Sequence, residues 1–167
     1  EIIGSRGGLA SVAASNIFYS QSTNNGATTI TCSGSCYGAA VYEYSGALAS
    51  GSPVDTSSGS VTQGCIGASC TGAPVTTSDA GDVIFAVAIP GSSITAVDAP
   101  YGNFLSGSNG QGSSDYIPGA TVTGSTAVWT DALPGDIFVT SVAAFLPAAS
   151  ASISKPRSNV IIVNDDS

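Results

Sequence analysis

The chain has 167 residues, only 8% of which are charged, and its 11 acidic and 3 basic residues give a net charge of −8. Three basic residues are too few to neutralise nucleic-acid phosphates or to form a polybasic membrane patch. The absence of histidine excludes a Ser-His-Asp triad, a Cys-His dyad and a histidine-ligated metal. With 43% hydrophobic residues, the chain can bury the core of one domain.

Short segments of alternating polarity, separated by Gly, Ser and Asn, predict strands rather than helices in the first half of the chain. We expect strands over residues 16–21, 27–32 and 36–44, with Asn25-Gly26 in the turn between the first two. Residues 45–60 are polar and predict a loop. Weak strands are expected at 60–63 and 75–77.

The second half contains the strongest strand signal, Asp82 to Ile89, with sequence DVIFAVAI. Because this run is apolar at both alternating sets of positions, we expect a strand that is covered on both faces. Further strands are expected at 94–97, 120–129 and 136–146, and a Gly/Ser-rich loop at 101–115. Roughly nine strands without a helix predict an all-β antiparallel sandwich. No apolar run reaches the ~18–20 residues that span a bilayer, so no membrane insertion is expected.

The four cysteines form two close pairs, Cys32 with Cys36 and Cys65 with Cys70. We favour two local disulfides, each closing a turn; crossed pairing, a zinc site and free buried thiols are the alternatives. Disulfides indicate an oxidising compartment, which predicts an extracellular or cell-surface protein. The first residues lack the features of a signal peptide, so we expect an exported chain to be a mature form or a fragment.

The composition changes near the end of the chain. Residues 1–148 are predicted to be the β-sandwich domain and residues 149–158 a linker that carries Lys155 and Arg157. Residues 159–167 contain a compact apolar strand with the sequence Asn159, Val160, Ile161, Ile162, Val163, Asn164.

Six short motifs occur in a characteristic order: Ile17-Phe18-Tyr19-Ser20, Thr28-Thr29-Ile30-Thr31, Glu43-Tyr44-Ser45-Gly46, Pro53-Val54-Asp55, the strand beginning Gly81-Asp82-Val83, and Ala143-Ala144-Phe145-Leu146-Pro147-Ala148. Together they resemble a jelly-roll-like β-sandwich domain that is common in large secreted and surface proteins of bacteria. The resemblance covers about residues 9–148. It implies an adhesive or structural module without catalytic residues.

In the pattern of that family, about two strands, one of them apolar, precede the strand at Ile17-Phe18-Tyr19. This chain lacks them at its N-terminus and has the apolar strand 159–164 at its other end. We therefore expect an incomplete sandwich, jelly-roll-like or Ig-like, that a donated strand completes. The strand either enters the next copy, which makes a homopolymer and resembles a donor-strand-exchanging fibre subunit, or folds back into its own domain; a free tail is the third reading. Lys155 and Arg157 would dock on an acidic patch of the neighbour.

The predicted function is therefore a structural subunit of an extracellular filament or surface assembly. The alternative is a carbohydrate-binding module that uses Tyr101, Phe104 and Trp129, for which core packing is the competing role.

A catalytic role for Glu43 would need a partner such as Asp82 or Asp136, and no carboxylate pair is identifiable, so we expect no enzyme and no cofactor. The acidic end, Asn164-Asp165-Asp166, lacks the spacing of a calcium loop, so no metal is expected there.

Overall fold

A computed structural model describes residues 2–5, 15–20, 38–44, 52–62, 64–147 and 160–163. Within these ranges the chain forms strands and connecting turns, with no helix. The strands are β1 (Ile2–Ser5), β2 (Ser15–Phe18), β3 (Gly38–Val41), β4 (Val54–Thr62), β5 (Ser69–Thr71), β6 (Val83–Pro90), β7 (Ile94–Val97), β8 (Gly102–Ser106), β9 (Gly112–Tyr116), β10 (Val128–Asp131), β11 (Phe138–Phe145) and β12 (Val160–Val163). The prediction of an all-β fold is confirmed.

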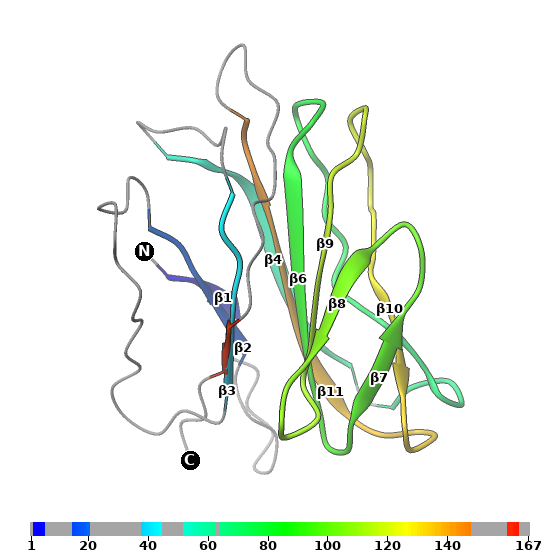
Figure 1. Ribbon diagram of the computed structural model, residues 1–167. Coiled ribbons are helices and arrows are strands. Elements are labelled where there is room, and N and C mark those ends of the chain that lie inside the picture. The colour runs from blue at the N-terminus through cyan, green and yellow to red at the C-terminus, as the bar shows by residue number, and fades with distance from the viewer. Residues whose placement is uncertain are drawn as a thin grey trace.

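The two larger sheets are antiparallel throughout. The central sheet has the strand order β4-β11-β6-β9-β8, and the smaller one has the order β5-β10-β7. Two further antiparallel pairs, β1 with β2 and β12 with β3, complete the described structure. Figure 1 shows β1, β2, β3 and β12 on one side of the central strands and β7 and β10 on the other.

The main core lies between the central sheet and the three-stranded sheet. Ile84, Ala86 and Ala88 of β6 point into it, and Trp129 of β10 packs there with no exposed surface. Alternation along β6 explains this arrangement, because every second side chain faces the same layer. Trp129 is therefore the largest single anchor between the two sheets.

The opposite face of the central sheet is also apolar. Phe85 of β6 and Ala143 of β11 pack there against Ile17 of β2, with Tyr42 beside them. Both β6 and β11 are consequently buried along nearly their whole length. This confirms the expectation that the run beginning at Asp82 is covered on both faces.

Two segments that were predicted to be loops contain strands. Part of the polar segment 45–60 belongs to β4, which pairs with β11, and the Gly/Ser-rich segment 101–115 contains β8 and most of β9. These sequences have few strand-forming side chains, so pairing with the apolar strands β11 and β6 overrides their local preference. The expected strand at 120–129 is also displaced, since β10 covers Val128–Asp131.

Candidate functional site

The apolar strand β12, which the sequence singled out, pairs antiparallel with β3 of the same chain. Val160 lies opposite Val41, Ile162 opposite Ala39 and Val163 opposite Gly38. Among the described strands, β3 is the one hydrogen-bonded neighbour of β12. The β3–β12 pair is thus a two-stranded ribbon, and β3 connects it to residues 42–44.

Two tyrosines directly after β3 fasten this ribbon to the central sheet. The Tyr44 hydroxyl donates a hydrogen bond to the Asp115 carboxylate of β9 at 2.7 Å. The Tyr42 hydroxyl donates to the carbonyl oxygen of Asn103 at 3.2 Å and shares a 3.1 Å hydrogen bond with the Ser113 hydroxyl. The two rings stack with centroids 6.3 Å apart, and the Tyr42 ring meets Phe85 edge-on. We call Tyr42 and Tyr44 the tyrosine anchor.

The surroundings of the tyrosine anchor favour neutral phenols. Burial raises the pKa of Tyr42 to about 12, and the Asp115 charge contributes in the same direction. Burial raises the pKa of Tyr44 well above its ordinary value, and the adjoining Asp115 carboxylate raises it further. Both hydroxyls therefore remain hydrogen-bond donors at any physiological pH.

A disulfide lies at one end of the small sheet. Cys65 and Cys70 are bonded to each other, which confirms one of the two predicted local disulfides. Cys32 and Cys36 lie outside the described residues. The loop that the bond closes is held by the Ile66 and Ser69 backbones, which hydrogen-bond each other, and by Gly135, whose N–H donates to the Gly67 carbonyl oxygen at 2.9 Å.

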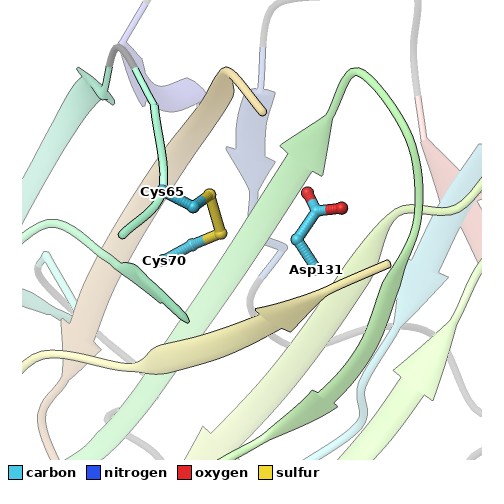
Figure 2. A group of neighbouring side chains, drawn as sticks. All are labelled: Cys65, Cys70 and Asp131. Atoms are coloured by element: carbon cyan, nitrogen blue, oxygen red, sulfur yellow. A yellow bond between two sulfur atoms is a disulfide. The ribbon is translucent and has the colours of Figure 1, made fainter. Parts of the chain in front are cut away.

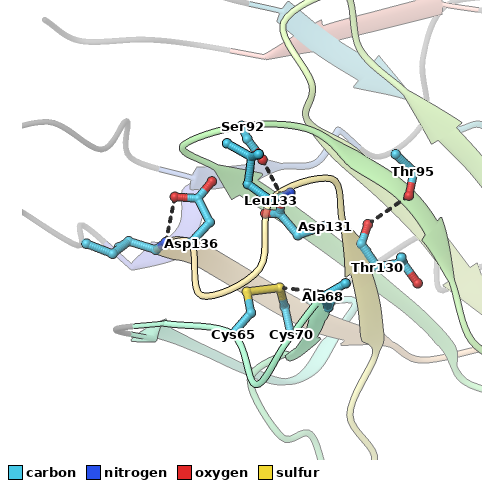
Figure 3. The surroundings of a disulfide bond; sticks show 10 residues. Cys65, Ala68, Cys70, Ser92, Thr95, Thr130, Asp131, Leu133 and Asp136 are labelled. Carbon is cyan, nitrogen blue, oxygen red and sulfur yellow. Dashed lines mark hydrogen bonds between the residues drawn. A yellow bond between two sulfur atoms is a disulfide. The ribbon is translucent and has the colours of Figure 1, made fainter.

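A buried carboxylate, Asp131 of β10, lies beside this disulfide, as Figure 2 shows. It accepts hydrogen bonds from the Ser92 hydroxyl and from the Leu133 N–H, and Figure 3 shows both. Although the two sulfurs and a carboxylate oxygen lie within 4.8 Å of one another, the sulfurs are consumed by the disulfide and cannot act as thiolate ligands. In the oxidised protein, the three groups brace the turn between β10 and β11.

A second buried carboxylate, Asp82, lies just before β6 and has 0% exposed surface. Its carboxyl group is within hydrogen-bonding contact of Asp55, on β4. Burial raises the pKa of Asp82 to about 7, and the neighbouring Asp55 and Asp79 carboxylates add to the shift. Asp55 is itself desolvated, but hydrogen bonds from Ser78 hold its pKa below the ordinary value. This contact joins residues 27 positions apart, and no sequence motif predicted it.

Of the residues predicted for the donated strand, Val160 to Val163 form β12. Asn159, Asn164, Lys155 and Arg157 lie outside the described residues, as does the predicted linker 149–158. Glu43 is exposed in the segment after β3. The carboxylate that contacts Asp82 is that of Asp55.

The aromatic residues considered for a glycan platform are core residues. Trp129 has 0% and Tyr101 4% of its surface exposed, and Phe104 is partly buried against the same cluster. A sugar stacks on an open ring face, which Trp129 and Tyr101 do not offer. The glycan-contact interpretation of these two residues is therefore wrong, and their role is packing between the two larger sheets.

Comparison of the chain with protein families, with curated proteins and with solved structures finds no match. None of the described residues forms a helix with the length and apolarity to cross a membrane.

Proposed function

We propose that this protein is a structural subunit of an extracellular filament or surface assembly, and that it polymerises by exchanging β12 between neighbouring copies. In the assembled form, β12 of one copy pairs with β3 of the next in the register given above. The fold would then be a β-sandwich of the jelly-roll-like or Ig-like class that a donated strand completes. The protein would have no catalytic role and no cofactor.

The observation that supports this proposal is the pairing of β12 with β3 alone among the described strands. A strand that makes backbone bonds to one partner can leave it without breaking a sheet. When it leaves, the edge of β3 keeps unpaired N–H and C=O groups, which are a template for an identical strand from another copy. The apolar sequence of β12 and its exchangeable position are both needed for strand donation.

The tyrosine anchor supports the other half of the proposal, a rigid acceptor. Tyr42 and Tyr44 hold the residues after Val41 to β8 and β9 through Asn103 and Asp115. An incoming strand would therefore meet a β3 whose position is already set by the central sheet. A preorganised acceptor loses less conformational entropy on binding.

The length of the chain between β11 and β12 also permits exchange. Twelve residues, 148–159, separate the described end of the domain from β12. A fully extended segment of this length spans about 40 Å, at roughly 3.3–3.6 Å per residue. That is comparable to the diameter of a small domain, so β12 can reach either its own β3 or that of an adjacent copy.

The location belongs to the same proposal. The Cys65–Cys70 disulfide is compatible with an oxidising environment outside the cell. An assembly exposed to that environment gains from covalent bracing of its turns. We therefore place the filament outside the cell or at its surface.

The decisive experiment is disulfide trapping between register partners. Val41 and Val160 lie opposite each other, so V41C and V160C are introduced in separate chains, which are mixed under assembly conditions and oxidised. We expect a covalent dimer on a non-reducing gel, because the two new cysteines meet only if β12 crosses between copies. The doubly substituted chain should give a ladder of covalent oligomers.

The matched control mixes V160C with G38C, since Gly38 pairs with Val163 at the opposite end of the ribbon. It should give little dimer. If the mixed single variants yield none, and the double variant cross-links only within one chain, β12 folds back into its own domain and strand exchange is wrong. Removing residues 158–167 should also abolish filaments in electron micrographs, and filaments that persist would contradict the proposal.

A further inference from the structure

The disulfide at the end of the small sheet lies against a buried carboxylate. The sulfurs of Cys65 and Cys70 and one carboxylate oxygen of Asp131 lie within 4.8 Å of one another, and Figure 2 shows the three side chains together. All three residues are buried, with 7%, 0% and 2% of their surface exposed. Among the described residues, no other three cysteine or acidic side chains come close enough to share one ion.

Asp131 has one oxygen without a partner in the described structure. Its Oδ1 accepts hydrogen bonds from the Ser92 hydroxyl and, at 2.9 Å, from the Leu133 N–H. Its Oδ2 is buried and accepts no hydrogen bond from a donor among the described residues. Buried polar atoms in native proteins are almost always satisfied, and the sulfurs of a disulfide have no proton to donate. An unpartnered carboxylate oxygen beside two sulfurs therefore points to a ligand.

The strand pairing explains why these side chains meet. Cys70 of β5 lies directly opposite Trp129 of β10, so the two side chains are on the same face of the small sheet. Side chains alternate along a strand, and in β10 Trp129 and Asp131 are the two buried positions. Cys70, Trp129 and Asp131 thus share the face that points into the core.

Backbone hydrogen bonds hold the three side chains together independently of the disulfide. The Asp131 N–H donates to the carbonyl oxygen of Ala68, inside the loop that the cysteines enclose, at 2.8 Å. The Cys65 N–H donates to the carbonyl oxygen of Asp136 at 2.9 Å, and Cys70 belongs to the β5–β10 ladder. Because cutting the S–S bond removes none of these contacts, the released sulfurs stay beside Asp131. A preorganised site loses less conformational entropy when it binds a ligand.

We propose that Cys65, Cys70 and Asp131 bind a structural zinc ion when the disulfide is reduced. Zinc accepts thiolate and carboxylate ligands, and four intervening residues are within the spacing of zinc-binding cysteine pairs. A water molecule would complete the tetrahedron. Thiolates disfavour calcium and magnesium, which prefer oxygen, and the carboxylate disfavours copper(I), which prefers soft ligands. The ion would hold the loop in place of the covalent bond.

Zinc binding and disulfide formation are alternative states of the same two sulfurs. A dithiol reductant supplies two electrons and two protons, so that the S–S bond breaks, two thiols form and the reductant becomes a disulfide. Zinc then displaces the two thiol protons to solvent. Oxidation by a disulfide reverses both steps and expels the ion.

The rearrangement that this requires is small. Ligand atoms around tetrahedral zinc lie about 3.4–3.8 Å apart, so Asp131 is already close to its place. The released sulfurs move apart by rotation about their Cα–Cβ bonds. The site belongs to the small sheet and not to the β3–β12 ribbon, so the proposal does not rest on strand exchange.

Cobalt(II) substitution tests the site, because cobalt bound by thiolates has a strong charge-transfer absorption in the near ultraviolet. Cys32→Ser and Cys36→Ser leave Cys65 and Cys70 as the only cysteines of the chain. This background protein is titrated with CoCl₂ in a phosphine reductant, which offers no competing thiol. We expect the absorption to saturate at one cobalt per chain and to disappear when zinc is added. The oxidised protein should show none.

Variants in the same background locate the ligands. D131N keeps the shape of the side chain and removes its charge, and it should weaken zinc binding at least about tenfold, since even outer-shell contacts contribute 10–100-fold. C65S, which leaves one thiol, should weaken it by at least as much. D98N, at an exposed aspartate after β7, should bind zinc as the background protein does. The proposal is overturned if the reduced protein shows no thiolate–cobalt absorption, if the oxidised protein binds equally, or if D131N keeps its affinity.

The test holds even if reduction unfolds the chain. Metal binding is coupled to folding, so zinc should then restore the native emission of Trp129, which is fully buried in the fold. The background protein and D98N should refold at a lower zinc concentration than D131N. If zinc restores no native emission, or if D131N refolds at the same concentration, the proposal is wrong.

Discussion

The hydroxyl of Tyr44 donates a 2.7 Å hydrogen bond to the carboxylate of Asp115, and this contact ties the segment that follows β3 to β9 of the central sheet. The two residues are 71 positions apart. Asp115 is buried, and the Asn103 side-chain amide donates to its other oxygen at 2.6 Å. The ribbon that we propose as the subunit interface therefore depends on a charged, desolvated hydrogen bond.

Removal of the two anchor hydroxyls should have graded effects on stability. Tyr44→Phe leaves Asp115 without one of its donors, and we expect a loss of about 1.5–3 kcal/mol because the acceptor is charged. Tyr42→Phe removes bonds to neutral groups and should cost about 0.5–1.5 kcal/mol. Urea denaturation of the two variants and of the wild type measures both values. Equal losses would show that the Asp115 charge adds nothing to the anchor.

The same tyrosines predict instability in alkali. Because burial raises the pKa of Tyr42 from 10.0 to about 12, the folded state keeps a proton that the unfolded state loses between these values. The contribution of this phenol to the free energy of unfolding is fully present below about pH 10. It decreases as the pH rises towards 12, by at most about 1.4 kcal/mol per pH unit for each such phenol. Tyr44 acts in the same direction.

Urea unfolding at several pH values from about 9 to 11 tests this dependence, with the Tyr42→Phe/Tyr44→Phe double variant as the control. The double variant should lose stability less steeply than the wild type as the pH rises. Parallel curves would place the alkaline sensitivity elsewhere in the chain.

The disulfide predicts a measurable contribution to stability. Cys65 and Cys70 enclose four residues, and loop-closure entropy for so short a loop gives a stabilisation of about 2 kcal/mol. Cys65→Ala/Cys70→Ala should lower the free energy of unfolding by about that amount in urea. An unchanged value would mean that the backbone hydrogen bonds of Ile66 and Gly67 hold the loop without the covalent bond.

Some features followed from the sequence because their signals are local. The apolar run in β6 predicted a strand covered on both faces, and β6 is buried along its length. Close spacing predicted the Cys65–Cys70 bond. The apolar run Val160 to Val163 predicted a strand, and β12 is one. In each case, neighbouring residues alone carry the hydrophobic alternation or the geometry that is needed.

Other features were decided by tertiary structure. The polar strands β4 and β9 exist because the edges of β11 and β6 supply hydrogen-bonding partners, which local propensity does not include. From the sequence Trp129 was a candidate for a sugar platform, but in the fold it is buried between the two larger sheets. The contacts of Tyr44 with Asp115 and of Asp55 with Asp82 join distant positions, the second with the help of a bulge. Local sequence was enough to predict the apolar strands β6, β11 and β12. The register and packing between strands determine which polar segments become strands and which carboxylates and hydroxyls meet, because those contacts depend on the position of one strand against another.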